Sequence, residues 1–236
     1  MMRALIVDDE LYARKGLQVL LQRTGEFDVV GACGDAVDAL SVIRKERPQV
    51  LFLDIQMPAI GGFELLSMIE EEIMPHVVFV TAYDEYAVKA FEQNALDYLL
   101  KPVQSERLTK TVQKLKKTLA EGTHPLYATP AIQRIPCLMI NKVKLIPTSE
   151  VEYVRSDAAG VYVVSPKGEF FTDLTLTVLE NKTKLFRCHK QFLVNLERID
   201  EILFRDSLGA ELKMSSDRTV PVSRRFLKKV KEQLGI

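Results

Sequence analysis

The sequence is organised around residues 50–58, which read Val-Leu-Phe-Leu-Asp-Ile-Gln-Met-Pro. Four consecutive large apolar residues need burial on both faces, which is typical of a central strand in a parallel sheet. Asp54 ends this run, so the stretch predicts a carboxylate at the carboxyl end of a strand, where open α/β sheets bind their ligands. Pro58 and Gly61 beyond it also fit a turn. On this stretch alone, Asp54 could equally be a turn residue that leaves the strand.

The length and composition of the chain fit two ordinary globular domains. It has 236 residues, of which 47% are hydrophobic, enough for two cores. The net charge is zero, but residues 1–120 carry 14 Lys and Arg against 18 Asp and Glu, whereas residues 121–236 carry 18 against 14. The resulting charges of −4 and +4 permit an anionic partner for the second half of the chain.

The cysteines and the apolar runs indicate a cellular compartment. Cys33, Cys137 and Cys188 are scattered in apolar surroundings without a CxxC spacing. This favours buried thiols in a reducing environment over a metal site or a disulfide framework. The apolar run at residues 3–7 is too short for a signal peptide, and no run reaches the roughly 18 residues of a membrane span. We therefore expect a cytoplasmic protein without a membrane partner.

A strand followed by a helix recurs along residues 1–120. Strands are expected where short apolar runs occur, at residues 3–7, 29–33, 50–54, 76–81 and 97–100. Helices are expected at residues 11–21, before Pro48, and at residues 62–72, 84–94 and 105–119. Five such strand–helix pairs predict an α/β doubly wound domain, in which five helices cover a parallel sheet of five strands.

Polar side chains follow several of these strands and should meet at one edge of the sheet. They are Asp8 and Asp9 after the first strand, Asp54 after the third, Thr81 at the end of the fourth and Lys101 after the fifth. Three neighbouring carboxylates repel one another, and a bound divalent cation removes that cost. Carboxylate oxygens favour Mg²⁺. Since Lys101 adds a positive charge and Thr81 a hydroxyl donor, the set predicts phosphoryl transfer to Asp54.

Several short motifs in residues 1–120 occur in a fixed order. They are Asp8-Asp9, Asp54 with Met57-Pro58 and Gly61, Thr81-Ala82, and Tyr98 followed by Lys101-Pro102. With these motifs, residues 1–120 resemble the receiver domain of bacterial response regulators. The resemblance implies that a sensor histidine kinase phosphorylates Asp54. Asp8, Asp9, Asp54 and the backbone carbonyl of Gln56 would hold Mg²⁺, and Thr81 and Lys101 would grip the phosphoryl group.

The same resemblance implies two conformational features near the acceptor. The peptide bond before Pro102 should be cis, as is essentially restricted to X–Pro bonds. Tyr98 should act as a switch residue that turns inward as Thr81 moves. Gln56 and Tyr83 follow the acceptor and the threonine by two residues each. Both could therefore border the path of an attacking water molecule and affect how long the phosphoryl group survives.

The sequence pattern changes after residue 120. Residues 121–134 contain a glycine and two prolines, which predict a linker. Residues 135–236 contain short runs of β-branched and aromatic residues separated by turn sequences, which predict a mainly-β domain. Strands are expected at residues 144–147, 151–155, 160–164, 169–173, 199–204, 210–214 and 218–222, and helices near residues 174–182 and 223–234. No helix-turn-helix is evident.

Two segments of the second domain combine cationic and apolar residues. Residues 186–195 include Arg187, His189, Lys190 and Gln191 beside apolar anchors. In residues 221–229, Ser223 is expected to cap a helix that has Arg224 and Arg225 in its first turn. Positive charge is unfavourable there, and a DNA phosphate would reverse the penalty. Taken alone, the second segment also fits a solvated helix face.

Together with Val151-Glu152-Tyr153-Val154 upstream, these segments resemble the LytTR DNA-binding domain over residues 135–236. Such domains are elongated stacks of β-sheets that place loop residues into successive major grooves. The resemblance implies contacts with double-stranded DNA from residues 157–162, from Lys190 with Gln191, and from Arg224 with Arg225. His189 would either support its loop or touch DNA. Residues 158–160 are small and uncharged.

The two halves together predict a response regulator of a two-component system. Phosphorylated on Asp54, it would dimerise and bind repeated DNA sites to regulate transcription. The dimer would form through the helix at 84–94, the last receiver strand and the helix at 105–119. Charged residues on that face that could pair are Glu85, Lys89, Asp97 and Arg107.

Two alternatives stay open at this point. The second domain could bind protein or RNA in place of DNA. The chain could also be an aspartyl-phosphate phosphohydrolase with Asp54 as a transient nucleophile, although such enzymes carry a second aspartate two residues on, where Gln56 stands. We expect a protein that is not an enzyme.

Overall fold

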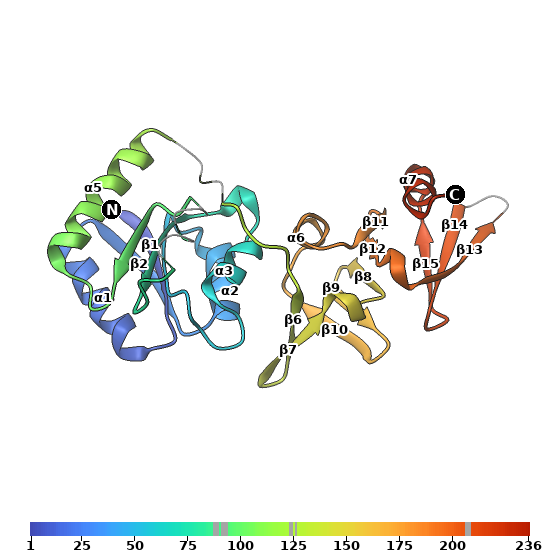
Figure 1. The fold of residues 1–236 in the computed structure, drawn as a ribbon, viewed down its shortest axis with the longest axis horizontal. Coiled ribbons are helices and arrows are strands. Elements are labelled where there is room, and N and C mark those ends of the chain that lie inside the picture. The colour runs from blue at the N-terminus through green and yellow to red at the C-terminus, as the bar shows by residue number, and fades with distance from the viewer. Residues whose placement is uncertain (87–89, 91–93, 123–124, 126, 206–208) are drawn as a thin grey trace. The chain divides into compact units, whose positions relative to one another are not determined.

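The computed structural model describes residues 1–86, 90, 94–122, 125, 127–205 and 209–236 (Figure 1). The chain divides into two compact units, Met1–Pro130 and Ala131–Ile236. Cys33, Cys137 and Cys188 are buried and free, as the sequence indicated. Within the described ranges, no helix has both the length and the apolar character needed to cross a membrane.

The first unit is a five-stranded parallel sheet in the order β2-β1-β3-β4-β5. Its strands are β1 (Met2–Val7), β2 (Phe27–Cys33), β3 (Val50–Leu53), β4 (His76–Thr81) and β5 (Asp97–Leu100). Its described helices are α1 (Leu11–Thr24), α2 (Ala36–Glu46), α3 (Gly62–Ser67) and α5 (Ser105–Ala120). The chain order reverses between β1 and β3, so this pair of strands is the switch point at which doubly wound sheets bind ligands.

Local signals set the ends of the first helices. Gly25 adopts φ 67° and its N–H donates to the carbonyl of Gln22, which ends α1. The side chain of Asp35 accepts hydrogen bonds from the N–H groups of Val37 and Asp38, both at 2.9 Å, which starts α2.

The third and fourth expected helices have different outcomes. The helix predicted over residues 62–72 is shorter, because the N–H groups of Met68 and Ile69 donate only three residues back and end α3. A separate 3₁₀ turn, η1, covers Glu71–Ile73. The helix predicted over residues 84–94 lies largely outside the described residues.

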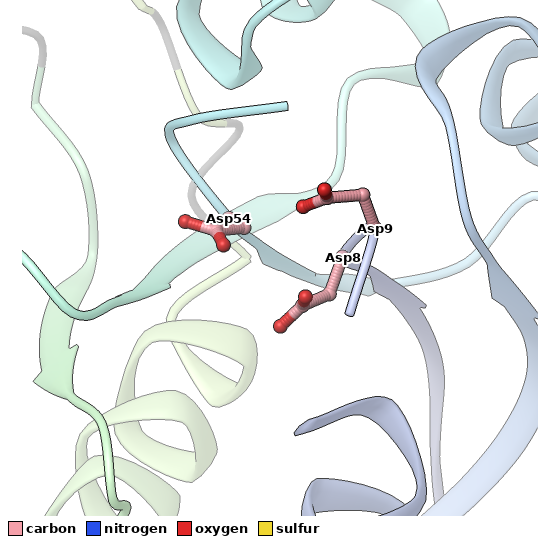
Figure 2. A group of neighbouring side chains, drawn as sticks. All are labelled: Asp8, Asp9 and Asp54. Atoms are coloured by element: carbon pink, nitrogen blue, oxygen red, sulfur yellow. The ribbon is translucent and has the colours of Figure 1, made fainter. Parts of the chain in front are cut away.

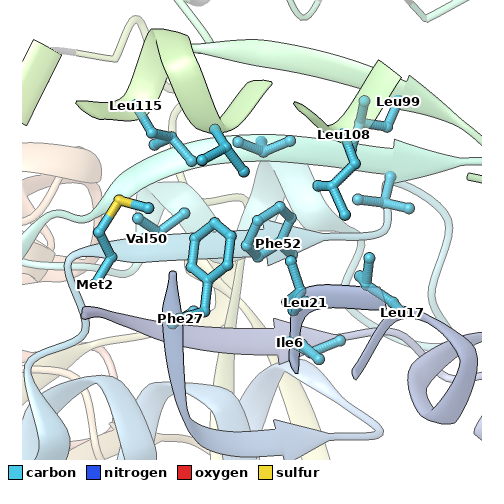
Figure 3. Packing of buried hydrophobic residues seen from close by; sticks show 14 of the residues in the cluster. Met2, Ile6, Leu17, Leu21, Phe27, Val50, Phe52, Leu99, Leu108 and Leu115 are labelled. Carbon is cyan, nitrogen blue, oxygen red and sulfur yellow. The ribbon is translucent and has the colours of Figure 1, made fainter. Parts of the chain in front are cut away.

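Helices cover both faces of the parallel sheet. Figure 1 shows α1 and α5 on one side of the sheet and α2 and α3 on the other. All four residues of β3 are buried, as its apolar run predicted. The ring of Phe52 lies 5.4 Å from that of Phe27 in an edge-to-face arrangement inside this core (Figure 3). Truncating such a phenylalanine costs about 3–5 kcal/mol, so the core fixes β3 and the residue that follows it.

The segment after α5 packs on the first unit. The hydroxyl of Tyr127 accepts a hydrogen bond from the N–H of Val77 at 2.7 Å, at the start of β4. Burial raises the pKa of the Tyr127 phenol well above its ordinary value. The segment expected to be a linker, residues 121–134, therefore contributes a side chain to the first unit.

The second unit is mainly β. A seven-stranded antiparallel sheet has the order β11-β12-β8-β9-β10-β6-β7, and a three-stranded sheet has the order β13-β14-β15. The strands of the large sheet are β6 (Arg134–Met139), β7 (Lys142–Pro147), β8 (Tyr153–Asp157), β9 (Gly160–Ser165), β10 (Gly168–Thr172), β11 (Phe186–His189) and β12 (Phe192–Val194). The small sheet consists of β13 (Ile199–Arg205), β14 (Gly209–Met214) and β15 (Thr219–Val222).

Short helical segments complete the second unit. They are η2 (Thr148–Glu150), α6 (Leu176–Lys182), η3 (Leu196–Arg198) and α7 (Arg224–Leu234). Val230 of α7 is buried in one core cluster with Leu212 and Val220 of the small sheet and Val194 of β12. This cluster joins the small sheet and the last helix to the large sheet.

Three strands were not expected from the sequence. β6 contains Pro136, which weakens a strand signal. β11 and β12 come from the segment interpreted as a basic patch, and they are too short for a period of two to stand out.

Candidate functional site

Three carboxylates meet at the carboxyl edge of the parallel sheet. Val7 at the end of β1 pairs with Leu53 at the end of β3, and the N–H of Asp54 donates to the carbonyl of Val7 at 2.8 Å. Ligand atoms of Asp8, Asp9 and Asp54 therefore lie within 4.8 Å of one another (Figure 2). Asp8 and Asp54 are buried, whereas Asp9 is exposed. The structure thus brings these three residues together at one edge of the sheet, as their positions after the strands predicted.

Lys101 balances part of this charge. Its Nζ lies 2.7 Å from Oδ2 of Asp54 and 2.8 Å from Oδ2 of Asp8. Burial alone would lower the pKa of Lys101, but the hydrogen bonds to Asp54 and Asp8 outweigh it and raise the pKa. The backbone N–H of Lys101 donates to the carbonyl of Thr81 at 2.9 Å, and the Lys101–Pro102 peptide is cis, as the resemblance implied.

Thr81 ends β4 beside this group. The residue is fully buried, and its Oγ1 has no hydrogen-bond partner among the described residues. A buried hydroxyl without a partner costs free energy, and a ligand oxygen at this edge would remove that cost.

A cavity of about 350 Å³ adjoins Asp54, and Asp9, Gln56 and Tyr83 also line it. The side-chain amide of Gln56 donates to the hydroxyl of Tyr86 at 2.9 Å. Gln56 and Tyr83 thus border the open space beside Asp54. Their effect on an attacking water molecule stays a prediction.

Tyr98 lies half-buried on β5, and its hydroxyl donates to the carbonyl of Tyr83. Burial, followed by the charges of Asp84 and Asp54, raises the pKa of Tyr98. The expected inward turn of this side chain stays a prediction.

The donor set fits Mg²⁺. Three carboxylates and one ammonium leave two negative charges at the edge, and hard oxygen donors are the ligands that this cation prefers. Asp8, Asp9 and Asp54 would hold it. The fourth expected ligand, the backbone carbonyl of Gln56, stays a prediction, since the described contact of that residue with Asp54 is through its N–H, 3.4 Å from Oδ1.

Backbone hydrogen bonds bring the three expected DNA-contacting segments to one end of the second unit. The β11–β12 turn carries Lys190 and Gln191, and the carbonyl of Gln191 accepts from the N–H of Ser156 in β8 at 2.9 Å. The N–H of Ser223, just before α7, donates to the carbonyl of Cys188 in β11 at 3.1 Å. The β8–β9 turn and the start of α7 therefore flank the β11–β12 turn.

The side chains expected to contact DNA at this end face solvent. Lys190, Gln191, Arg224 and Arg225 are exposed. Ser223 is the N-cap of α7, but its side chain accepts no hydrogen bond from the helix. The guanidinium of Arg225 lies 4.8 Å from the ring centroid of Phe226. The first turn of α7 thus combines exposed positive charge with N–H groups that the Ser223 side chain does not cap, which suits a phosphate.

His189 supports its own turn. Its Nδ1 accepts a hydrogen bond from the N–H of Gln191 at 3.2 Å, and its ring centroid lies 5.7 Å from that of Phe192. Burial, followed by the charge of Lys190, lowers the pKa of His189. Of the two roles left open for this residue, the geometry favours the supporting one.

The β8–β9 turn is poor in available positive charge. The side chain of Asp157 accepts from the N–H of Ala159 at 2.8 Å, and Arg155 forms ion pairs with both Asp157 and Glu169. Gly160 adopts φ 136°, and a Cβ there would lie 2.5 Å from the ring of Phe171. The shape of this turn therefore depends on Gly160. The nearest cation, Arg155, is already paired with two carboxylates.

Two residues of the expected dimer face are paired within the chain. Nη1 of Arg107 lies 2.9 Å from Oδ2 of Asp97. The sequence alone does not show that β5 and α5 bring these two residues together. Lys89 lies outside the described residues, and a dimer through this face stays a prediction.

The comparisons with known proteins agree with this division. Residues 4–113 match the response regulator receiver domain, and residues 141–235 match the LytTr DNA-binding domain. A response regulatory protein of Vibrio cholerae is 49% identical over 235 residues, covering 100% of this chain and 99% of the relative. The transcriptional regulatory protein BtsR of Escherichia coli strain K12 is 46% identical over 239 residues, with 100% of both chains covered.

Solved structures resemble each half separately. The response regulatory domain of protein mrkE from Klebsiella pneumoniae is 35% identical, with a TM-score of 0.46, and covers 51% of this chain and 99% of its own. A LytTr DNA-binding domain from Bacillus cereus is 23% identical, with a TM-score of 0.42, and covers 45% of this chain and 100% of its own.

The matched domains define a response regulator that joins a receiver to a DNA-binding module. The chain belongs to the response regulators with a LytTR DNA-binding domain, and its full length aligns with relatives that include the BtsR proteins. The family assignment inferred from the sequence motifs is confirmed.

Proposed function

We propose that the chain is a cytoplasmic transcription factor controlled by phosphorylation of Asp54. The observation that carries the proposal is the placement of Lys101 between Asp54 and Asp8, beside a buried Thr81 hydroxyl without a partner among the described residues. A phosphoryl group on Asp54 would give both groups an oxygen to bind. The donor would be a phosphohistidine of a sensor histidine kinase.

The transfer follows from the positions of these side chains. A carboxylate oxygen of Asp54 forms a bond to phosphorus while the bond from phosphorus to the histidine nitrogen breaks, and the nitrogen keeps that electron pair. Lys101 Nζ, already 2.7 Å from Oδ2 of Asp54, offsets charge on the phosphoryl oxygens. The Thr81 hydroxyl donates to one of them. Bound Mg²⁺ would supply further positive charge at the same oxygens.

The output would be sequence-specific binding of double-stranded DNA. Lys190 with Gln191 and Arg224 with Arg225 are exposed on neighbouring segments, and phosphate contacts by such cations position a protein on the duplex. His189 would act through the turn that it supports. Pairing of two phosphorylated chains would make binding of a second DNA repeat effectively intramolecular.

Neither alternative gains support from a specific observation. The second domain matches a DNA-binding family, which favours DNA over protein or RNA as its partner. For a phosphohydrolase, the residue two positions after Asp54 would be a second carboxylate, whereas Gln56 is an amide that donates to Tyr86. The chain therefore has no acid at the expected place, and we infer a regulator that is not an enzyme.

The test is to phosphorylate the full chain with acetyl phosphate and Mg²⁺ and to locate the added group by mass spectrometry. We expect modification of Asp54, a shift from monomer to dimer in sedimentation, and tighter binding to a duplex selected from a random pool. Asp54→Asn is the matched control, because it keeps the size of the side chain and should show none of these changes. A chain that takes up no phosphoryl group would contradict the proposal.

A further inference from the structure

Glu152 is a fully buried acidic residue outside both sites described above. It precedes β8, and its side chain is 0% exposed. Its Oε2 accepts a hydrogen bond from the hydroxyl of Ser216 at 2.6 Å and lies 3.7 Å from Nη1 of Arg218. Its Oε1 has no hydrogen-bond partner in the described part of the chain. Burying a carboxylate in this way needs an explanation, because it costs free energy unless its oxygens are fully bonded.

The backbone of Glu152 is bonded to two further strands. Its N–H donates to the carbonyl of Val164 in β9 at 2.9 Å, and its carbonyl accepts from the N–H of Asn195, just after β12, at 2.8 Å. Its side chain holds the turn between β14 and β15 through Ser216. One residue thus links the beginning of β8, the end of β12 and the beginning of β15.

Each of these strands carries a DNA-contacting segment at its other end. β8 leads to the turn at residues 157–160, β12 starts directly after Gln191, and β15 leads to Arg224. The strands are 5, 3 and 4 residues long. They therefore span roughly 10–17 Å at about 3.3 Å per residue. Over so short a length, a shift at the Glu152 end carries through to the contacting end.

Neighbouring polar groups strengthen the same link. The guanidinium of Arg198 donates to the carbonyl of Ser149 through Nη2 at 2.8 Å and through Nε at 3.2 Å. The carbonyl of Arg198 accepts from the N–H and the hydroxyl of Ser215 at 2.9 and 3.0 Å. We define the polar junction as Ser149, Glu152, Asn195, Arg198, Ser215, Ser216 and Arg218.

A contribution to stability explains Glu152 poorly. The 3.7 Å separation from Arg218 exceeds the roughly 2.7–2.9 Å of a charge-assisted hydrogen bond. Arg218 is also 40% exposed in its side chain, and its Nη1 donates to the carbonyl of Ser165 at 3.0 Å. Such a pair does not offset the burial of the carboxylate, and apolar residues often serve stability better at buried positions. The bonds of Glu152 to separate strands point instead to a role in their mutual placement.

We propose that Glu152 is a positioning residue for DNA recognition. By holding β15 against β8 and β12, it sets the distance between Arg224 and the turns at residues 157–160 and 189–191. The proposal rests on the proposed DNA contacts of these segments. Glu152 itself touches no DNA, so its loss should leave the electrostatic attraction to DNA intact and reduce the ability to distinguish sequences.

The experiment compares Glu152→Ala, Glu152→Gln and Ser216→Ala in the full chain. Each variant is titrated with two duplexes of equal length: one selected from a random pool by the unchanged protein, and a scrambled version of it. We expect Glu152→Ala and Ser216→Ala to lose about tenfold or more in their preference for the selected duplex, the size of one misplaced base contact. Binding of the scrambled duplex should change less than about twofold, because that binding depends on charge.

Glu152→Gln separates the hydrogen bond from the charge. Its amide oxygen still accepts from Ser216, so this variant should recover most of the preference. The matched control is Ile146→Ala. Ile146 is buried in β7, at the opposite edge of the large sheet from β11, and it is not a member of the polar junction, so its truncation lowers stability while leaving the side chains of the junction in place. All titrations are run at a temperature where circular dichroism shows each variant to be folded.

Three outcomes would overturn the proposal. Ser216→Ala could keep the full preference for the selected duplex over the scrambled one. That result would overturn the proposal even if Glu152→Ala does not fold. Ile146→Ala could lose as much preference as the junction variants, which would reduce the role of Glu152 to stability. The unchanged protein could show no preference for any duplex, which would remove the proposed DNA function together with the positioning role.

Discussion

The receiver edge and the proposed DNA-contacting end of the second unit hold their lysines in opposite ways. Lys101 is only 14% exposed in its side chain and lies within hydrogen-bond distance of two buried carboxylates. Lys190 is exposed, and its turn is fixed by backbone hydrogen bonds to β8 and to the residue before α7. The first site depends on a balance of buried charges and the second on the placement of the backbone. The same substitution at Lys101 and at Lys190 should therefore have effects of different size on stability and on function.

The largest effect is expected for Lys101→Met. Without the ammonium, charge on the phosphoryl oxygens is less well offset, and we expect the rate of phosphorylation by acetyl phosphate to fall about 10²–10³-fold. The carboxylates of Asp8 and Asp54 also lose their cation, which should lower the free energy of unfolding by about 3–5 kcal/mol in EDTA. Added Mg²⁺ should restore part of that loss. Quenched-flow labelling and urea denaturation measure the two quantities.

Lys190→Met is the matched control for this comparison. It should leave the phosphorylation rate and the free energy of unfolding unchanged, within about 0.5 kcal/mol for a surface position. A Lys101→Met chain that is phosphorylated at the normal rate would break the comparison.

The next largest effect is expected for Arg107→Met. Burial alone would raise the pKa of Asp97, but hydrogen bonds from Arg107, from Thr111 and from the N–H of Tyr98 outweigh it and hold the pKa below its ordinary value. This stabilisation is present above the unfolded pKa of about 3.9 and is lost as pH falls through the lower folded value. Removing Arg107 should cost about 2 kcal/mol at pH 7 and much less in acid. Denaturation at pH 7 and pH 3 measures both, and an equal loss at the two values would contradict the pairing.

A smaller effect is expected for Lys190→Ala and Arg224→Ala. Each removes one exposed cation, so each should flatten the dependence of log affinity on log salt by about one unit for duplex DNA. Neither should change the unfolding free energy noticeably. Fluorescence anisotropy over a range of salt concentrations measures the slope. Unchanged slopes in both variants would show that DNA lies elsewhere on the domain.

The smallest effect is expected for His189→Ala, a few-fold loss in specific affinity, since the ring only supports the turn. Burial and the charge of Lys190 lower the pKa of His189, so the folded turn prefers the neutral ring that accepts from Gln191. Its stabilisation is present above the unfolded pKa of about 6.5 and is lost as pH falls toward the lower folded value. The protection of the Gln191 amide against exchange, measured relative to its intrinsic rate at each pH, should therefore fall below about pH 6.5. Protection that stays constant over this pH range would contradict the supporting role.

The receiver could be largely predicted from the sequence because its signals are local. The apolar run of β3 and the polar residues at the strand ends can be recognised without knowing which strands pair. Parallel strands then bring their ends to one edge of the sheet. The internal pair of Asp97 and Arg107 was missed, because it needs β5 and α5 to be placed first.

The second domain was harder to predict because its contacts join distant segments. β12 pairs with β8, so that Leu193 lies opposite Val154. The strands are short, and their order in the sheet does not follow the chain. The family resemblance suggested Lys190 and Arg224 as DNA contacts, which stay predictions. The role proposed for Glu152 depends on bonds to Asn195 and Ser216, which no local pattern reveals.

The hydrogen bond from Val77 to Tyr127 has a practical consequence for dividing the protein. A receiver cut after residue 120 would lose the hydroxyl that caps the start of β4, the strand that ends at Thr81. The N–H of Val77 would then contact water beside apolar surface. The shortened protein would therefore differ from the receiver as it folds in the full chain. A cut after Pro130 keeps Tyr127 with its strand. By the same reasoning, a gene fusion that gave this receiver a new output domain would need to carry these ten further residues with it.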